Sequence, residues 1–167
     1  MTESKRYLYR GENSQLYTEN KGKLIPKSTD AFLYAFNYGI SDRKYGSGGS
    51  YGVSPENAVL GHQIDSKKYP TSGISATPHF ERACYYALGN GKFENGYIFK
   101  IDCDLLESNN VKEWLVAKYA TLPSVPEDDE VILVSNDFGV LPDNIVVEII
   151  SVGKKASIYA IKESQSL

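Results

Sequence analysis

The chain has 167 residues, of which 41% are hydrophobic and 23% charged, as expected for a globular domain rather than a disordered or fibrous chain. We therefore expect one domain over residues 1–167. The formal net charge is −3, and the basic residues are scattered among acidic ones. Binding to a nucleic-acid duplex draws its affinity from clustered Lys and Arg. The charge distribution therefore excludes that class of function.

Two further classes are excluded by the distribution of apolar residues. Residues 1–10 are polar and charged and contain no apolar signal core. No segment approaches the roughly 18 apolar residues that a membrane span needs. We therefore expect a soluble protein that is cytoplasmic, or that a dedicated system secretes or injects into a target cell.

The chain is rich in tyrosine and poor in metal-binding residues. Its 13 tyrosines favour a β-rich protein with a groove, because the ring can be buried while the hydroxyl keeps a polar partner. The two cysteines, Cys84 and Cys103, cannot form a disulfide framework, although a single bridge between them stays open. With only His62 and His79 to add to them, we expect no metal site.

The first half of the chain has the stronger helical signals. Residues 6–10 alternate as in a strand that ends at Gly11. Residues 28–38 read as a helix, residues 46–52 as a glycine-rich loop, and Ser54 followed by proline opens a second helix that runs through His62.

A third helix has the clearest beginning. Ile74 and Ser75 read as a short strand, and Thr77 is then expected to cap a helix whose first turn contains Pro78. Gly89 is expected to end this helix.

Strands dominate the second half of the chain. Strands are expected over residues 96–103, 130–134, 144–152 and 157–162, and a helix over residues 109–119. Helices therefore come first and strands later, which predicts an α+β fold with an antiparallel or mixed sheet, with helices mainly in the N-terminal half.

Two familiar motifs are only partly present. The glycine-rich loop at residues 46–52 lacks the Lys-Ser/Thr of a P-loop, so it is either a flexible surface loop or a mobile lid over a cleft. Gly73-Ile74-Ser75 resembles the start of a nucleophile elbow but lacks its second glycine. A hydrolase that uses Ser75 with His62 or His79 is a minor alternative.

Three other features are informative together. Arg10 ends the first strand, Ser75-Ala76-Thr77 leads from a strand into a helix with Ala83 eight residues on, and the acidic run at residues 127–130 enters a strand. Each alone has an ordinary explanation: a solvated arginine, a helix cap and a solvated turn.

In order and spacing, these features resemble the catalytic chain of cholera-type enterotoxins and related mono-ADP-ribosyltransferases of the Arg-Ser-Glu class. The segments that carry the resemblance are Leu8-Tyr9-Arg10, Lys23 to Lys27, His62, Ser75-Ala76-Thr77 with Ala83, Tyr97 to Ile101, Asp128-Asp129-Glu130-Val131, and Gly139 to Pro142. Two positions depart from the family pattern: Ala76 replaces the central Thr of Ser-Thr-Ser, and Asp128 replaces the first acid of Glu-x-Glu.

The resemblance implies an ADP-ribosyltransferase fold, with a β core split around a cleft for NAD. It implies transfer of ADP-ribose from NAD to a protein side chain, arginine first, with release of nicotinamide, as in a bacterial toxin or effector. By this resemblance the catalytic residues are Glu130, Asp128 and Ser75. The residues expected to bind NAD are Arg10, Gly11, Ser75, Thr77 and His62.

The chemistry suits these residue types. Breaking the glycosidic bond of NAD develops positive charge on the ribose, which a carboxylate such as Glu130 stabilises. The planar guanidinium of Arg10 matches phosphate oxygens in pairs. In an extended turn Asp128 would lie on the same side as Glu130, close enough for one acid to polarise the incoming nucleophile.

Two alternatives to transfer remain open: an NAD glycohydrolase on the same fold, and a catalytically silent domain that binds NAD or a partner protein. The partners expected are NAD and a target protein. An activating or delivery partner would leave no mark on this sequence.

Overall fold

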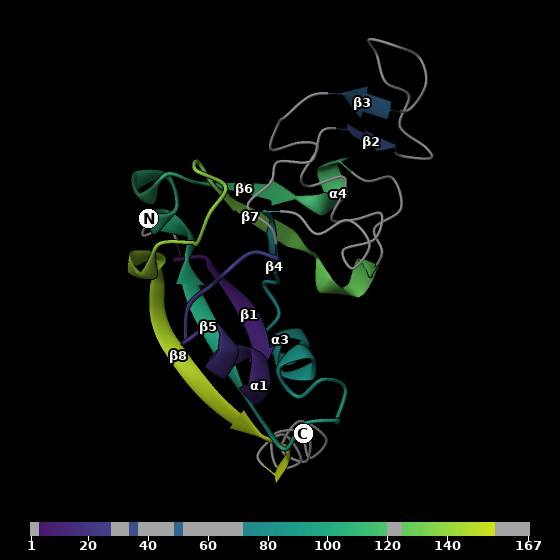
Figure 1. Cartoon of the computed structure of the whole chain (residues 1–167), viewed down its shortest axis with the longest axis vertical. Helices are drawn as coiled ribbons and strands as arrows, with labels where there is room; N and C mark the ends of the chain where they lie inside the picture. The colour runs from purple at the N-terminus through teal and green to yellow at the C-terminus, as the bar shows by residue number, and fades with distance from the viewer. Residues whose placement is uncertain (1–3, 28–33, 37–48, 52–71, 120–124, 156–167) are drawn as a thin grey trace.

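The computed structural model describes residues 4–27, 34–36, 49–51, 72–119 and 125–155. Within them the chain combines strands and helices, which confirms the α+β class. In chain order the elements are β1 (Tyr7–Asn13), α1 (Ser14–Glu19), β2 (Tyr34–Phe36), β3 (Gly49–Tyr51), β4 (Ile74–Ala76), α3 (Phe80–Ala87), β5 (Asn95–Asp102), β6 (Val111–Leu115), α4 (Val116–Tyr119), β7 (Val131–Ser135) and β8 (Val146–Gly153) (Figure 1).

Two three-stranded sheets form the framework, and all their strand pairs are antiparallel. The first sheet has the order β1-β5-β8, and the second has the order β4-β7-β6. The short strands β2 and β3 pair with each other. The expectation of an antiparallel β core is therefore confirmed.

Helices cover both faces of the first sheet. On one face α1 brings Tyr17 against β5, where its ring stacks on Tyr97 at 3.9 Å between centroids. On the other face α3 buries Ala83 and Ala87 against Ile98 of β5. Alternating residues of β5 therefore face different helices, as the two-residue period of a strand requires.

The second sheet is centred on β7, whose five residues are all buried. A strand buried on both faces reads as a continuous apolar run, and its sequence is Val-Ile-Leu-Val-Ser. The edge strand β4 pairs with β7 so that Ser75 lies opposite Ile132.

Within the part of the chain that the structure describes, an isolated backbone bridge joins the two sheets. The N–H of Tyr9 in β1 donates to the carbonyl of Thr77 at 2.7 Å, and the N–H of Thr77 donates to the carbonyl of Tyr9 at 2.9 Å. Thr77 directly follows β4. The bridge therefore holds the Arg10 end of the first sheet beside the Ser75 end of the second.

Helix α3 approaches the first sheet closely because two glycines face it. A Cβ atom on Gly11 would lie 2.0 Å from the carbonyl oxygen of Ala83, and one on Gly96 would lie 2.1 Å from that of Ala87. Neither position has room for any side chain, so the glycines set the distance between helix and sheet.

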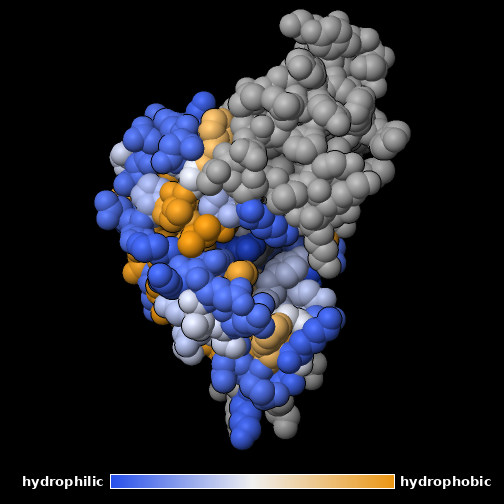
Figure 2. Space-filling model, in the orientation of Figure 1, coloured by the Kyte–Doolittle hydropathy of each residue, from blue (hydrophilic) through white to orange (hydrophobic). Residues whose placement is uncertain are grey.

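Strand β8 is an edge strand of the first sheet, and several of its side chains are exposed. Orange, hydrophobic side chains gather on the side of the molecule that β8 crosses in the orientation of Figure 1 (Figure 2). On β8 itself, Val147 and Ile149 are 48% and 43% exposed.

Several boundaries differ from those predicted. The first strand does not end at Gly11 but continues to Asn13, whose side chain accepts from Leu16 N–H and caps α1. Helix α1, over Ser14–Glu19, was not predicted from the sequence. The predicted helix over residues 28–38 is wrong at Tyr34–Phe36, and the loop over 46–52 is wrong at Gly49–Tyr51, because these segments pair as β2 and β3.

The third helix begins later than predicted. Thr77 is held extended by its bridge to Tyr9, so α3 begins at Phe80 and its N-cap is His79. The hydroxyl of Thr77 still accepts from His79 N–H at 3.1 Å. Gly89 follows the C-cap with φ of 54°, which confirms it as the residue that ends the helix.

The helix predicted over residues 109–119 is wrong in its first half. Val111–Leu115 forms β6, and only Val116–Tyr119 is helical. Pairing with the buried strand β7 outweighs local helix preference here. The strands predicted over 96–103, 130–134 and 144–152 are confirmed to within about two residues as β5, β7 and β8.

Some predicted elements lie outside the described residues, namely the helix over 54–62 with His62 and the strand over 157–162. Among the described residues, no helix is long and apolar enough to cross a membrane. Cys84 and Cys103 are both free thiols, so no bridge joins them.

The contact between Gly11 and α3 leads to a prediction about stability. Gly11→Ala forces a methyl group into the backbone of Ala83, and such overpacking costs about 1–3 kcal/mol of unfolding free energy. Urea unfolding measures the loss. In the matched control, Gly153→Ala, the new methyl group meets the Asn95 side chain at 3.2 Å, a neighbour that can move, so its stability should stay near that of the parent. Equal stability of Gly11→Ala and the parent would contradict the packing role.

Candidate functional site

A cavity of about 250 Å³ lies where the two sheets meet. Its walls come from β1, from the segment after α1, from β4 and α3, and from the turn that precedes β7. Six residues proposed from the sequence line it: Arg10, Gly11, Ser75, Thr77, Asp128 and Glu130. The structure therefore brings together side chains that are up to 120 residues apart in the chain.

Arg10 is held from two sides. Its Nη1 donates to the backbone carbonyl of Ser75 at 3.2 Å, and its Nε lies 3.6 Å from a carboxylate oxygen of Glu12. The two-residue period of β1 places Arg10 and Glu12 on the same face of the strand. The guanidinium, 26% exposed, is thereby oriented in the cavity wall.

Glu12 is a buried acid behind that guanidinium, with its side chain 2% exposed. Burial raises the pKa of the Glu12 carboxyl above its ordinary value of 4.5, while the charge of Arg10 acts in the opposite direction. Glu12 was not among the residues proposed from the sequence. The available signal was its spacing, two residues after Arg10 on a predicted strand.

Ser75 and Thr77 reach the cavity from β4 and from the residue just beyond it. The Ser75 carbonyl accepts from Arg10, as described above. The Thr77 hydroxyl donates to the backbone carbonyl of Asp128 at 2.5 Å. This contact ties the strand-to-helix segment to the acidic turn.

The acidic turn is not extended, which corrects the geometry predicted for it. Pro126–Asp128 is a 3₁₀ turn, and Asp129 has a left-handed backbone with φ of 45°. Glu130 follows, with its backbone carbonyl accepting from Val116 N–H at 3.0 Å, before β7 begins. Asp128 and Glu130 both line the cavity, as the sequence predicted, although by a different backbone path.

The carboxylate of Asp128 is bound by helix α3. Its Oδ1 accepts from Arg82 Nε at 2.5 Å, and its Oδ2 accepts from the Tyr86 hydroxyl. Burial and the bond to Asp128 raise the pKa of Tyr86 to about 12, and the same carboxylate raises the pKa of Arg82. The side chain of Asp128 is 9% exposed.

Among the aromatic residues of α3, Tyr86 lines the cavity whereas Phe80 and Tyr85 do not. All three are about 40% exposed, so none belongs to the core. Arg82 and Tyr86 are one helical turn apart, a spacing that places both on one face of α3. Because the sequence does not show which strand or turn that face meets, Arg82 could not be linked to Asp128 in advance.

The two histidines proposed from the sequence have different outcomes. His62 lies outside the described residues. His79, the alternative partner for Ser75 in a hydrolase, does not line the cavity, and its Nε2 bonds to Asp129 at 2.6 Å. Gly11 lines the cavity, but its closest neighbours are backbone atoms of α3.

The charges in the cavity are of two kinds. Arg10 and Lys27 supply cationic groups, and Asp128 and Glu130 supply carboxylates. Such a wall can hold an anionic group such as a phosphate at its cationic side and stabilise developing positive charge at its acidic side. A guanidinium, a hydroxyl and a carboxylate therefore lie around one cavity.

Comparison with known protein families identifies the family of this chain. The NarE family matches residues 7–133, which is more than half of the chain and includes every element that contributes to the cavity. The chain therefore belongs to the NarE family, a family of ADP-ribosyltransferases known from Neisseria. No curated protein matches the chain.

The burial of Glu12 predicts a pH effect on stability. Its raised pKa means that the folded protein binds this proton more tightly than the unfolded chain, so the contribution of Glu12 is lost as pH rises from 4.5 through the folded pKa. Urea unfolding between about pH 4 and pH 7 should therefore show a smaller loss of stability with rising pH in Glu12→Gln than in the parent. Glu19→Gln, an exposed neighbour, is the control. Parallel pH curves for Glu12→Gln and the parent would contradict this.

Proposed function

We propose that this protein is a mono-ADP-ribosyltransferase that transfers ADP-ribose from NAD to a protein side chain and releases nicotinamide. The observation that carries the proposal is the convergence of Arg10, Ser75 and Glu130 on one cavity, from β1, β4 and the turn before β7. Membership of the NarE family supports the class of reaction.

Glu130 is the carboxylate proposed to act at the ribose. The nicotinamide of NAD is already cationic and leaves without a general acid, so the site must mainly stabilise positive charge that develops on the sugar. A fixed carboxylate does this, and preorganised groups of this kind contribute about 3–4 kcal/mol each. Glu130 suits this role because its backbone is fixed between the acidic turn and β7.

Arg10 is proposed to hold the phosphates. Its guanidinium is a permanent charge with a planar set of donors, and the contacts to Ser75 and Glu12 fix its direction. Binding the phosphates far from the reacting carbon converts binding energy into orientation of the ribose. The cavity of about 250 Å³ lies below the range of about 300–1,000 Å³ typical of small-molecule sites, so we propose that the described walls hold only the reacting end of the dinucleotide.

The remaining parts of the proposal follow from the resemblance of the motifs. They are an ADP-ribosyltransferase fold in which the two sheets flank the NAD cleft, arginine as the acceptor, and action as a bacterial toxin or effector. Ser75 and Thr77 would support Glu130 from the strand-to-helix segment. Thr77 already bonds to the turn that carries it.

A second candidate is hydrolysis of NAD on the same site, and one observation favours it. In the enterotoxin-like enzymes that the motifs resemble, transfer to arginine uses the first acid of the Glu-x-Glu pattern to polarise the acceptor. In this chain that acid is Asp128. Its two oxygens are bound by Arg82 and Tyr86. Water needs less activation by a dedicated acid once the ribose carries positive charge, so hydrolysis remains compatible with this geometry.

One experiment separates the candidates. The protein is incubated with NAD labelled in the adenylate part and with a lysate, and both labelled proteins and free ADP-ribose are measured. Labelled proteins with modified arginine support transfer, whereas free ADP-ribose alone supports hydrolysis. Binding of NAD with neither product would leave only a silent binding domain, and mass spectrometry of labelled proteins would identify the acceptor residue.

Glu130→Gln tests the carboxylate. We expect turnover of NAD to fall about 10²–10³-fold, because the substitution removes charge but keeps the shape of the side chain, while the affinity for NAD changes little. The matched control is Glu127→Gln, an exposed acid in the same turn that does not line the cavity. Full activity of Glu130→Gln, measured by release of nicotinamide, would refute the assignment.

Arg10→Lys tests the phosphate contact. Lysine keeps the charge but loses the planar pair of donors, so we expect KM for NAD to rise about tenfold, with a smaller change in kcat. Steady-state kinetics give both constants. The control is Arg6→Lys, because Arg6 pairs with Glu113 outside the cavity. Unchanged KM in Arg10→Lys would show that Arg10 does not hold the dinucleotide.

A further inference from the structure

The second acid of the candidate site is embedded in a cluster that we call the Asp128 clamp, formed by Asp128, Arg82, Tyr86 and Thr77. Arg82 and Tyr86 each bond to one carboxylate oxygen of Asp128, and the Thr77 hydroxyl bonds to its backbone carbonyl. Three donors from the segment at residues 77–86 therefore hold one residue of the acidic turn.

The carboxylate in this clamp is poorly placed to act on an acceptor. It is 9% exposed, and each oxygen already accepts a hydrogen bond from α3. A buried acid bound in this way is costly to disturb, because breaking one contact leaves a charge without a partner. Asp128 therefore resembles a structural anchor more than a group that exchanges protons with an acceptor.

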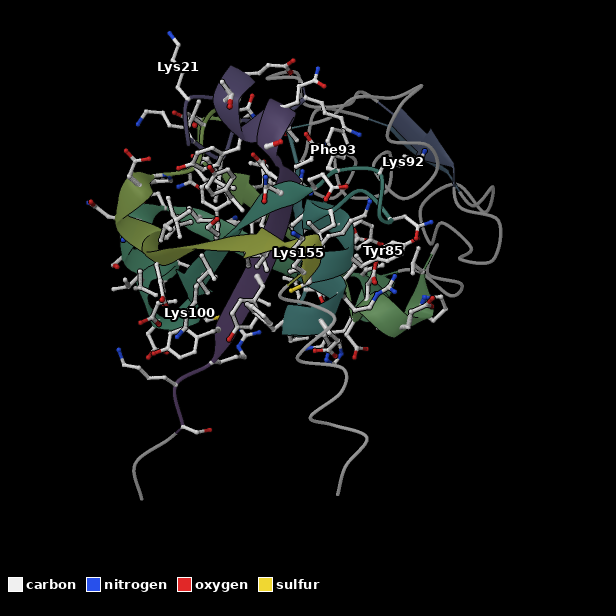
Figure 3. The ribbon with its side chains drawn as sticks, turned by 90° about the horizontal axis from the view of Figure 1, so that it is seen from below. Lys21, Tyr85, Lys92, Phe93, Lys100 and Lys155 are labelled. Atoms are coloured by element: carbon white, nitrogen blue, oxygen red, sulfur yellow. The ribbon has the colours of Figure 1, made fainter. Side chains whose placement is uncertain are left out.

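Arg82 is held in place by more than the ion pair. Its guanidinium carbon lies 4.7 Å from the centre of the Tyr85 ring and 5.5 Å from that of Tyr86. These contacts are cation–π interactions, which restrict the guanidinium further. Figure 3 shows Tyr85, which lies on α3, at the other side of the view from Lys100 of β5.

The clamp acts on the backbone that leads to Glu130. Between Asp128 and Glu130 lies only Asp129, whose backbone is left-handed with φ of 45°, a conformation uncommon for non-glycine residues that Asp adopts more readily than most. Such a conformation persists when surrounding contacts determine it. Here the contacts are the clamp on one side, the pairing of Val131 with β4 and β6 on the other, and the bond from His79 Nε2 to the Asp129 carboxylate at 2.6 Å.

The helix that supplies the clamp is itself fixed to the sheet that carries Arg10. Gly11 and Gly96 allow α3 to contact the backbone of β1 and β5. Helix α3 therefore contacts both the turn before Glu130, through the clamp, and β1, the strand that carries Arg10.

We infer that Asp128, Arg82 and Tyr86 are positioning residues that fix the carboxylate of Glu130 relative to Arg10, and that Asp128 does not activate the acceptor. The inference rests on the proposed function, since it concerns the same site, and it changes the role of the second acid. It requires NAD hydrolysis and protein modification to depend on the clamp equally, because both begin with the step at Glu130.

Arg82→Gln is the primary test, since Arg82 does not line the cavity. Loss of the ion pair should lower kcat for hydrolysis and for transfer by the same factor, about 10–100-fold, because a displacement near 1 Å is enough for such losses. The affinity for NAD, measured by calorimetry on the Glu130→Gln background, should change less than about threefold. Arg82→Lys, which keeps the charge, should recover part of kcat. Arg6→Gln, which removes an arginine–carboxylate pair elsewhere, is the control and should leave kcat unchanged.

Asp128→Asn separates the two roles. A positioning role predicts equal losses in both reactions and a non-additive double variant with Arg82→Gln, because both substitutions break one contact. Loss of transfer with hydrolysis retained would overturn the inference, since it would show that Asp128 serves the acceptor. Full activity of Arg82→Gln in both reactions would overturn it as well.

A readout independent of turnover keeps this test distinct from that of the proposed function. Absence of both reactions in the parent protein would refute the proposed function alone. Hydrogen exchange of the amides at residues 127–130 would then still test the clamp. Faster exchange there in Arg82→Gln, with unchanged exchange in β5, supports the clamp, and unchanged exchange at both places refutes it.

Discussion

Two backbone hydrogen bonds between Tyr9 and Thr77 bring the strand of Arg10 and the strand of Ser75 together at the candidate site. They join two antiparallel sheets at one point, and the next residue in β1 is Arg10, while the strand that precedes Thr77 contains Ser75. A guanidinium and a strand edge are thus brought together by main-chain geometry, and the 3.2 Å contact from Arg10 to the Ser75 carbonyl follows from it. The same bridge holds Thr77 extended, so α3 begins only at Phe80. The Thr77 hydroxyl can therefore donate to the acidic turn.

Glu130 reaches the same cavity by a separate route. The strand that follows it, β7, is completely buried and paired on both sides, so Glu130 lies at the end of the most constrained strand of the second sheet. The turn before Glu130 contains Asp129, whose backbone is left-handed, and α3 binds this turn through Arg82 and Asp128. Helix α3 in turn rests on the first sheet through Gly11 and Gly96. Among the described residues, the wall of the cavity is therefore shared by one strand of each sheet, by α3, and by the loops and turns between them.

The sequence predicted the parts of this arrangement that depend on local pattern. The α+β class and the strands β5, β7 and β8 follow from alternation and apolar runs, and Arg10, Ser75 and Glu130 follow from the order of the motifs. It did not predict β6, because the preference for a strand at Val111–Leu115 comes from its partner β7. Nor did it predict that Gly11 has a packing contact or that Arg82 reaches Asp128, since both depend on how α3 lies against distant segments. The compact turn at Pro126–Asp128 was missed for the same reason: contacts from Thr77 and Arg82 determine it.

The two acids of the turn show how one short segment can hold carboxylates in different surroundings. Asp128 is buried and saturated by donors from α3, so its charge is balanced inside the protein. Glu130 is one step beyond the left-handed residue, in the wall of the cavity that also contains Arg10. A shorter acid at position 128 fits the first role, because a carboxylate on a short side chain stays close to the helix that binds it. In the proposed arrangement, the clamp on Asp128 also positions the backbone that leads to Glu130, the carboxylate on which the proposed chemistry depends.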